Sequence, residues 1–369
     1  MYLEHLSVSN FRNYVAAELQ PAPQGVTLLQ GDNGAGKTNL LEAVGYFATL
    51  RSFRGAPTTS LVRNGTQQAV LRARANRQGR ALLIEAEINV SGRDKVQLNR
   101  QPLRRNDELL GAVLVTVFSP DDIEVVKGAP QSRRQYLDEI LISLHPKHHA
   151  AHAELERVLK QRNALLRSAA GTLRGSMAST LDVWDLKMAE VGESIASSRE
   201  ALVASLQDES DQAYLKLSVA PIASHRAVGL RYERSWEGSL VAALASARGE
   251  DVRRGVTSVG PQRDDLFMSI EGLAARTQAS QGEQRSLALA LRLGGHSLVT
   301  ARQSSSPVLL LDDVFSELDP HRSAALAACL PEGQTLLTSA GPVPDGLPVA
   351  RHALVRDGAL YPATDDASP

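Results

Sequence analysis

Cysteine is nearly absent from this chain of 369 residues, which contains only Cys329. A single thiol excludes a disulfide within the chain, and the apolar, helix-forming residues around it predict a buried structural thiol in a reducing cytoplasm. Long apolar runs are also missing: none reaches the roughly 18–20 residues that span a bilayer, so we expect no membrane partner. Residues 1–5 begin neither a basic stretch nor an apolar core, so the sequence predicts no signal peptide.

Charge is balanced over the whole chain but not along it. The formal net charge is −1, whereas residues 1–180 carry a net +7 and residues 181–369 a net −8. The basic excess is concentrated in residues 51–105, where 12 basic residues face 3 acidic ones. A polyanion such as DNA is therefore sought there first, although arginines on strands also serve as a solvated surface. The candidates for DNA contact are Arg51, Arg54, Arg72, Arg74, Arg104 and Arg105.

A glycine-rich stretch at residues 31–38 matches the pattern G-x-x-x-x-G-K-[ST] without a mismatch. Residues 26–30 before it read as a buried strand, and residues 39–44 after it begin an apolar helix. Strand, loop and helix in this order form the setting of a phosphate-binding loop. A plain glycine turn is the alternative, and the match of both pattern and context makes it the weaker one.

The residue types in this loop suit a bound nucleotide. Gly34 and Gly36 lack a Cβ, so the backbone can curl and direct N–H groups to one point, where the helix N-terminus adds positive charge. Lys37 can reach the β- and γ-phosphates, and the Thr38 hydroxyl can ligate Mg²⁺. The predicted ATP-binding residues are Gly31, Asp32, Asn33, Gly34, Ala35, Gly36, Lys37, Thr38 and Asn39.

Two adjacent acids, Asp312 and Asp313, follow the apolar run at residues 307–311. Carboxylates at the end of a buried strand are costly unless they serve a cation and a water molecule. In a protein with a phosphate-binding loop this is the expected second element, with Asp312 supporting Mg²⁺.

Residues 280–284, Ser-Gln-Gly-Glu-Gln, open a long amphipathic helix. Ser280 is the predicted N-cap, and Glu283 three residues later completes a capping box. A well-capped helix start is therefore a sufficient explanation of this segment by itself.

The middle of the chain changes character twice. Residues 65–103 alternate between apolar and polar side chains and predict an antiparallel meander with arginines on its outer face. Residues 121–255 read as a helical insertion. Residues 154–168 are amphipathic, and a second helix follows a glycine turn with apolar residues at spacings typical of a heptad seam. These seam residues are Leu181, Trp184, Met188, Val191, Ile195 and Leu202.

We expect the two helices to form an antiparallel coiled-coil arm, the second helix being roughly 35–40 Å long. An ordinary helical subdomain packed on the rest of the chain is the alternative. Four histidines lie just before the first of these two helices in the sequence: His145, His148, His149 and His152. The spacing of His148 and His152 would suit a zinc site on one helix face. Because no cysteine or acid stands beside them in the sequence, a surface cluster is favoured.

The phosphate loop, residues 280–284 and the strand before Asp312 occur in the order of the ABC-type ATPases, whose signature sequence is close to residues 280–284. Further pieces are similar to the RecF family of bacterial recombination mediators, and the resemblance runs from residue 1 to about residue 360. It implies an α/β fold with an ABC-type ATPase head, formed by residues 1–120 and 256–369, and an inserted α-helical, coiled-coil-like arm at residues 121–255. The similar pieces are residues 10–14, 31–38, 133–138, 159–163, 260–266 and 316–319.

The resemblance also implies a function. Proteins of this family bind ATP, dimerise head to tail around two nucleotides, and hydrolyse ATP slowly with stimulation by DNA. They bind single-stranded and double-stranded DNA at gaps or junctions and act with RecR and RecO to place RecA on gapped DNA. Recombinational DNA repair, replication restart and SOS induction follow from that activity, as does a cytoplasmic location.

Roles carry over to the matching positions of this chain. Lys37 and Thr38 match residues that hold phosphate and Mg²⁺, Asp312 matches the support of Mg²⁺, and Asp313 matches the catalytic acid that positions water. Asp319 matches the residue that links the two sites across the dimer. The signature that contacts the γ-phosphate bound in the other subunit corresponds to Ser280, Gln281, Gly282, Glu283 and Gln284.

Two positions depart from the wider ABC pattern. Residues 115–120 contain no glutamine to sense Mg²⁺ and water, and residues 335–340 offer only hydroxyls where a switch histidine is expected. The absence of both side chains is consistent with slow ATP hydrolysis, which would time a process instead of driving movement.

Two other classes share such a head. The ATPase subunit of a membrane transporter predicts a short helical insert, which the long seam and the basic segment argue against. A structural clamp of the SMC kind usually carries much longer arms or a zinc-binding tip, whereas this chain has no Cys-x-x-Cys.

Overall fold

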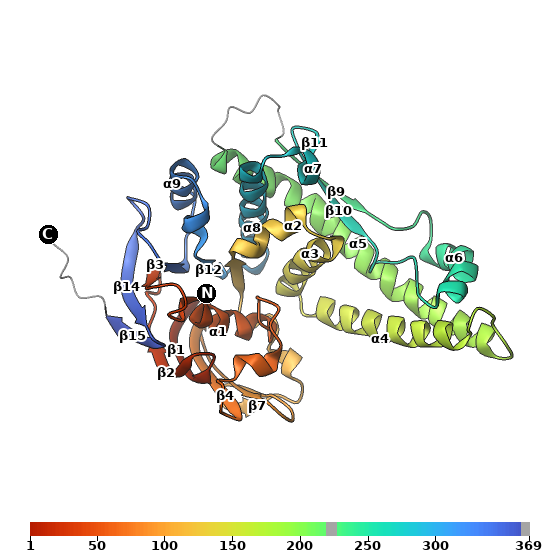
Figure 1. The fold of residues 1–369 in the computed structure, drawn as a ribbon, viewed down its shortest axis with the longest axis horizontal. Coiled ribbons are helices and arrows are strands. Elements are labelled where there is room, and N and C mark those ends of the chain that lie inside the picture. The colour runs from red at the N-terminus through yellow and green to blue at the C-terminus, as the bar shows by residue number, and fades with distance from the viewer. Residues whose placement is uncertain (219–226, 363–369) are drawn as a thin grey trace. The chain divides into compact units, whose positions relative to one another are not determined.

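The computed structural model describes residues 1–218 and 227–362, and Figure 1 traces the chain from its red N-terminus to its blue C-terminal strands. The chain divides into two compact units. Unit 1 contains Met1–Asp122, Gln212–Ile222 and Arg285–Pro369, and unit 2 contains Ile123–Asp211 and Ala223–Gln284. Each unit combines segments that are distant in the sequence, as expected when one domain is inserted into another. No helix in the described residues is long and apolar enough to cross a membrane.

The two units differ from the expected domain boundaries. Residues 256–284, expected in the head, lie in unit 2, because β10 (Asp265–Ile270) pairs there with β9 (Val228–Glu233). The end of α5 (Met177–Leu217), from Gln212 onward, belongs to unit 1 and not to the arm. Residues 363–369 of the expected head lie outside the described residues.

Unit 1 contains an antiparallel sheet that includes the predicted meander. Its strands are Tyr2–Phe11 (β1), Tyr14–Leu19 (β2), Gln68–Arg77 (β4), Arg80–Asn89 (β5), Lys95–Leu98 (β6) and Gln101–Pro102 (β7). Their order in the sheet is β2-β1-β4-β5-β6-β7. Alternate residues of β4 face the core, so Ala73 and Ala75 are buried while Arg72 and Arg74 are exposed.

The second sheet of unit 1 has a parallel centre and positions the candidate site. Its strands are Gly25–Gln30 (β3), Val115–Phe118 (β8), Val308–Asp312 (β12), Gln334–Ser339 (β13), Val349–Arg356 (β14) and Ala359–Pro362 (β15). They lie in the order β15-β14-β3-β13-β12-β8. Strands β3, β13 and β12 are neighbours and parallel, so their carboxyl ends lie at the same edge of the sheet. The helices Lys37–Thr49 (α1) and Pro320–Ala328 (α9) also belong to unit 1.

Unit 2 is mainly helical and includes a small sheet of order β11-β10-β9, with β11 at Leu273–Ala274. Its helices besides α5 are Ile123–Lys127 (α2), Pro130–Leu144 (α3), Lys147–Ser168 (α4), Leu240–Arg254 (α6) and Ala275–Gln278 (α7). The long helix α8 (Gln281–Gln303) begins in unit 2 and continues in unit 1. The insertion is thus helical, as the sequence predicts, with a β-element that the sequence placed in the head.

The predicted seam is buried against two helices instead of one. Figure 1 shows α4 and α5 side by side, with α6 against both. Met188 packs in a cluster with Val158 of α4 and Leu240 of α6, and Leu181 packs with Leu166 and Val252 in the same way. Helices α4, α5 and α6 therefore pack together as a three-helix bundle within unit 2. Helix α5 is also longer than expected, since its 41 residues span about 60 Å at 1.5 Å per residue.

Candidate nucleotide-binding site

The loop between β3 and α1 has the backbone of a phosphate cradle. Gly36 is the N-cap of α1 with φ of 116°, and Gly34 has φ of 83°, both in the region that favours glycine. A Cβ added at Gly36 would lie 2.6 Å from Asn13 Nδ2 and 2.9 Å from the Tyr14 hydroxyl. The loop therefore requires glycine at position 36 for both conformation and space. The curl ends at a helix N-terminus, which favours an anion.

Lys37 lies inside this curl. Its side chain is buried, and Nζ donates to the carbonyl oxygens of Gly31 at 2.7 Å and Asp32 at 2.9 Å. These bonds hold a positive charge close to the loop N–H groups, so the loop presents both a cation and amide donors to a phosphate.

Asp312, at the end of β12, meets the loop directly. Its Oδ1 accepts hydrogen bonds from Thr38 Oγ1 at 2.7 Å and from Thr338 Oγ1 at 2.8 Å. Burial raises the pKa of Asp312, although both threonine hydroxyls and the charge of Arg54 oppose that shift. A carboxylate and a hydroxyl in contact at the edge of a parallel sheet are hard oxygen ligands of the kind that Mg²⁺ prefers. The residues present therefore fit a magnesium nucleotide.

Asp313 has different surroundings from its neighbour. Its backbone lies in the left-handed region, with φ of 49° and ψ of 29°, where residues other than glycine are uncommon. Its N–H donates to Thr338 Oγ1 at 2.9 Å, which helps to fix this conformation. Within residues 1–218 and 227–362 its half-buried carboxylate makes no hydrogen bond or ion pair. Asp313 thus combines a strained backbone with a carboxylate that no described residue engages.

Thr338 was not among the predicted site residues, yet it contacts both acids. It lies in β13, in the segment where the sequence lacks a switch histidine. Its contact with the two acids could have been inferred only from the pairing of β13 with β12, because that contact follows from strand register and not from a sequence motif.

The segment at residues 10–14 supports the loop from behind, a role that the sequence motif did not reveal. Asn13 Nδ2 donates to the Ala35 carbonyl at 3.0 Å, and Asn13 Oδ1 accepts from Asn39 Nδ2 at 2.7 Å. The Tyr14 hydroxyl donates to the Gly36 carbonyl at 3.1 Å. Arg12 forms a bidentate ion pair with the buried Glu42 of α1, with both distances 2.7 Å.

The six candidate arginines for DNA contact are all exposed, but they differ in their partners. Arg72 pairs with Glu85 at 2.6 Å, and Arg105 pairs with Asp107 at 2.6 Å. In the described part of the chain, Arg51, Arg54, Arg74 and Arg104 make no ion pair. Arg54 is set apart by its effect on the pKa of Asp312, which places its charge within electrostatic range of the candidate nucleotide site.

The signature segment (residues 280–284) forms the predicted capping box in unit 2. Ser280 donates from its backbone N–H and from Oγ to Glu283 Oε2, both at 2.7 Å, and Oγ accepts from the Glu283 N–H at 3.3 Å. Gln284 is buried and donates to the carbonyls of Ala275 and Arg276. Ser280 and Gln281 are exposed, so the start of α8 is accessible to a partner.

Asp319 is also a helix cap. Its carboxylate accepts from the Arg322 N–H at 3.0 Å at the start of α9 and pairs with the Arg322 side chain. These bonds hold the pKa of Asp319 below its usual value. Within unit 1 the same region is tied to α8, because Arg285 pairs with Glu317 at 2.5 Å and Arg322 Nε donates to Ser286 Oγ at 3.0 Å.

The histidine cluster does not form a metal site among the residues that the structure describes, where no group of three or more potential ligands is found. His152 Nε2 lies 3.1 Å from Asp138 Oδ1 of α3. No acid stands beside these histidines in the sequence, and the acid that His152 contacts comes from the preceding helix.

Comparison with known proteins identifies the family. The family model described as "RecF/RecN/SMC N terminal domain" matches residues 2–338. A relative from Frankia alni, named "DNA replication and repair protein RecF", is 44% identical over 359 residues, which cover 92% of this chain and 93% of the relative.

Solved structures agree with this result. The structure described as "recombination mediator protein RecF-ATP in RecFOR pathway" has a TM-score of 0.88 at 28% identity and covers 98% of each chain. An Smc head bound to the C-winged helix domain of ScpA has a TM-score of 0.58 at 15% identity, covering 98% of this chain and 96% of that one, and shows the shared fold alone. The chain therefore belongs to the RecF family of DNA replication and repair proteins, within the wider RecF/RecN/SMC group.

Proposed function

We propose that this chain binds ATP with Mg²⁺ in unit 1, dimerises on DNA when ATP is bound, and hydrolyses ATP slowly with stimulation by DNA. The observation that carries the proposal is the 2.7 Å contact between Thr38 and Asp312, which joins the loop after β3 to the acids after β12. A pair of hard oxygen ligands beside a glycine-lined cradle suits a magnesium nucleotide. The similar protein described as "RecF-ATP" supports the same ligand.

The residues would divide the work of binding and hydrolysis. The loop N–H groups and Lys37 would hold the β- and γ-phosphates, while Thr38 and Asp312 would hold Mg²⁺. The ion supplies neutralisation of charge on the phosphoryl oxygens. Asp313, whose carboxylate is not engaged by another described residue, would orient the attacking water. Thr338 would keep both acids in place through its hydroxyl.

A second copy of the chain would complete each site. In this proposal the signature segment faces the γ-phosphate held by Lys37 of the other copy, and Asp319 links the two sites across the dimer. Support comes from the resemblance to the ABC signature and from the exposed N-terminus of α8, whose dipole favours an anion. Because Ser280 also caps its own helix, its role in the dimer needs a direct test.

The substrate proposed for the dimer is gapped or junction DNA, with single-stranded and double-stranded parts. RecR, RecO and RecA are the proposed protein partners in the cytoplasm, in recombinational repair, replication restart and SOS induction. The names of similar proteins, "DNA replication and repair protein" and "RecFOR pathway", support this assignment. The exposed arginines Arg74 and Arg104 offer charge for the phosphate backbone.

The proposal is tested by measuring ATP hydrolysis together with the oligomeric mass of the protein. ATP turnover is followed without DNA and with gapped, duplex and single-stranded DNA, and sedimentation is measured with and without ATP. We expect slow basal turnover, the largest stimulation by gapped DNA, and a dimer that forms only with ATP. Turnover by a monomer that ignores DNA would contradict it.

A further inference from the structure

Three pieces of sequence that the nucleotide site does not use converge on one loop of unit 2. The loop runs from residue 257 to residue 264, between α6 and the first residue of β10. Residues of the segment 133–138 in α3 and of the segment 159–163 in α4 contact it. Together with residues 260–266, these two segments carry the family resemblance. Because these segments meet at one loop, we infer that they hold the loop in position together.

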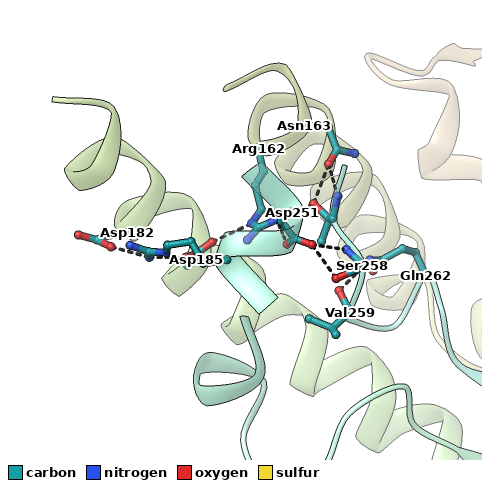
Figure 2. Close-up of polar contacts among 10 residues, drawn as sticks. Arg162, Asn163, Asp182, Asp185, Asp251, Ser258, Val259 and Gln262 are labelled. Atoms are coloured by element: carbon teal, nitrogen blue, oxygen red, sulfur yellow. Dashed lines mark hydrogen bonds and ion pairs between the residues drawn. The ribbon is translucent and has the colours of Figure 1, made fainter. Parts of the chain in front are cut away.

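A buried ionic network fixes the first part of the loop (Figure 2). Arg162 is fully buried, and its guanidinium donates to Asp185 at 2.7 Å, to Asp251 at 2.7 Å and to Thr257 Oγ1 at 2.8 Å. Asp251 Oδ1 accepts from the Ser258 N–H at 2.9 Å. The network thus reaches the loop at two successive residues, Thr257 through Arg162 and Ser258 through Asp251.

This network is not the arrangement that would maximise stability. Arg162 Nη2 is buried and has no hydrogen-bond partner in the described residues. Buried ion pairs often contribute little net stability, because desolvation offsets their attraction. The network does fix the geometry of the loop. A functional side chain carried by a loop requires such a fixed backbone.

Arginines of α3 and α5 hold the rest of the loop. Arg199 donates to the Pro261 carbonyl at 2.8 Å and forms a bidentate pair with Asp138. Arg133 forms a bidentate pair with Asp265, at 2.5 and 2.9 Å. The loop is thereby fixed on both sides of residue 263.

Asp264 anchors the loop from the inside. Its carboxylate accepts from the Tyr232 hydroxyl at 2.5 Å and from the Ser235 N–H at 2.7 Å. Gly260 has φ of 122°, and a Cβ there would lie 2.5 Å from Met188 Cε, so the turn is closely packed. A backbone this constrained holds its exposed side chain at a defined place.

That exposed side chain is Arg263. Its N–H donates to the Gly260 carbonyl at 2.8 Å within the turn, whereas its guanidinium makes a single long contact, 3.4 Å to the Thr257 carbonyl. It makes no ion pair in residues 1–218 or 227–362. Arg134 of α3 donates to the carbonyl of the following residue, Asp264, at 2.7 Å, and partial burial lowers the pKa of this second guanidinium.

We propose that Arg263, presented by the clamped loop and assisted by Arg134, binds a phosphate of the DNA backbone. A guanidinium matches phosphate geometry with two parallel hydrogen bonds, and a loop already fixed in place loses little entropy on binding. The inference rests on the proposed DNA-binding function and adds a contact in unit 2 to it. Phosphate contacts position a protein on DNA without reading sequence.

The test measures binding of gapped DNA to the full chain at several salt concentrations, with Arg263→Ala and Arg263→Lys. We expect Arg263→Ala to weaken binding about tenfold and to reduce the salt slope by about one. Arg263→Lys keeps the charge and should retain the slope with part of the affinity. Arg253→Ala is the matched control, because Arg253 is exposed in the same unit and already paired with Glu250.

A further variant separates charge from position. Tyr232→Phe removes the hydroxyl that holds Asp264, so it should weaken DNA binding less than Arg263→Ala and leave the salt slope unchanged. The inference would be overturned if Arg263→Ala bound DNA with wild-type affinity and salt slope. It would also be overturned if Arg263→Ala kept its DNA binding but lost ATP-dependent dimerisation or binding of a protein partner. If the wild-type chain itself bound no DNA, the proposed function would fail instead.

Discussion

Asp312 and Asp313 are adjacent in the sequence, but the structure gives them different chemistry. Asp312 is buried and accepts from two threonine hydroxyls, and burial raises its pKa. Asp313 has a left-handed backbone and an unengaged carboxylate among the described residues. In the proposed function, Asp312 is held in place to share a cation, while Asp313 is available to orient water. Environment, not residue type, separates the two proposed roles.

Asp313→Asn tests this separation. Asparagine tolerates the left-handed conformation well and keeps the shape of the side chain, so folding should be unchanged. Loss of the negative charge should reduce single-turnover ATP hydrolysis by about 10² or more, while ATP binding stays close to wild type and the ATP-bound dimer accumulates. Turnover at the wild-type rate would show that another group positions the water.

His296 of α8 gives a prediction about pH. It is buried between Thr116 and Ser306, each 3.1 Å from a ring nitrogen, and burial lowers its pKa to about 4. The unfolded chain binds a proton at this histidine below about pH 6.5, but the folded chain does not until about pH 4. The free energy of unfolding should therefore fall as pH decreases through that window, by at most about 3 kcal/mol from this residue.

The measurement is urea unfolding at pH 7.5 and pH 5 for the wild type and His296→Gln. Glutamine can still hydrogen-bond both hydroxyls but does not titrate, so the variant should lose less stability between the two pH values. An equal loss in both proteins would mean that other groups set the dependence.

At the scale of elements, local motifs were predictable and their neighbours were not. The phosphate loop, the strand before Asp312 and the capping box at Ser280 are defined by consecutive residues, and the structure has each where the sequence places it. The contact of Thr338 with both acids, and that of Asn13 with the loop, depend on strand order and register. No spacing within the sequence carries that information.

The helical insertion shows the same limit. Its heptad seam correctly indicated packing between α4 and α5, but α6 comes after both helices in the chain and covers the same surface. Because β9 pairs with β10, residues 256–284 likewise lie in unit 2 and not in the head, where the sequence predicted them. Long-range packing therefore decided the domain boundary.

The antiparallel sheet of unit 1 and the segment after β7 give a prediction about DNA. Arg74 and Arg104 are exposed and make no ion pair in the described residues, whereas Arg72 and Arg105 are each paired with an acid. Charge reversal of Arg74 and Arg104 together should weaken DNA binding and reduce its salt slope by up to about two, since fewer counterions are released. Reversal of Arg72 and Arg105 is the matched control and should do less. DNA affinity is measured without ATP, and equal effects of the two pairs would contradict the assignment.

In the proposed assembly, the whole molecule is a dimer, and one copy of the chain does not complete a nucleotide site. Unit 1 supplies the phosphate loop and both acids, and the proposed partner copy supplies the signature segment. Ser280 is the residue on which this claim can be tested, because its local role and its proposed distant role predict different results. As a cap alone, Ser280→Ala would cost about 1 kcal/mol of stability and nothing else.

Complementation between two defective variants shows whether a nucleotide site is shared between two copies. Ser280→Arg should fold and bind ATP, but it should not dimerise or hydrolyse, and Lys37→Met should bind ATP poorly. In a mixed dimer one site pairs the intact Lys37 of the first variant with the intact Ser280 of the second, while the other site carries both defects. ATPase activity of the mixture, with sedimentation in ATP, should therefore exceed that of either variant alone. A mixture no more active than its parts, or a Ser280→Arg protein that still dimerises with ATP, would contradict the account.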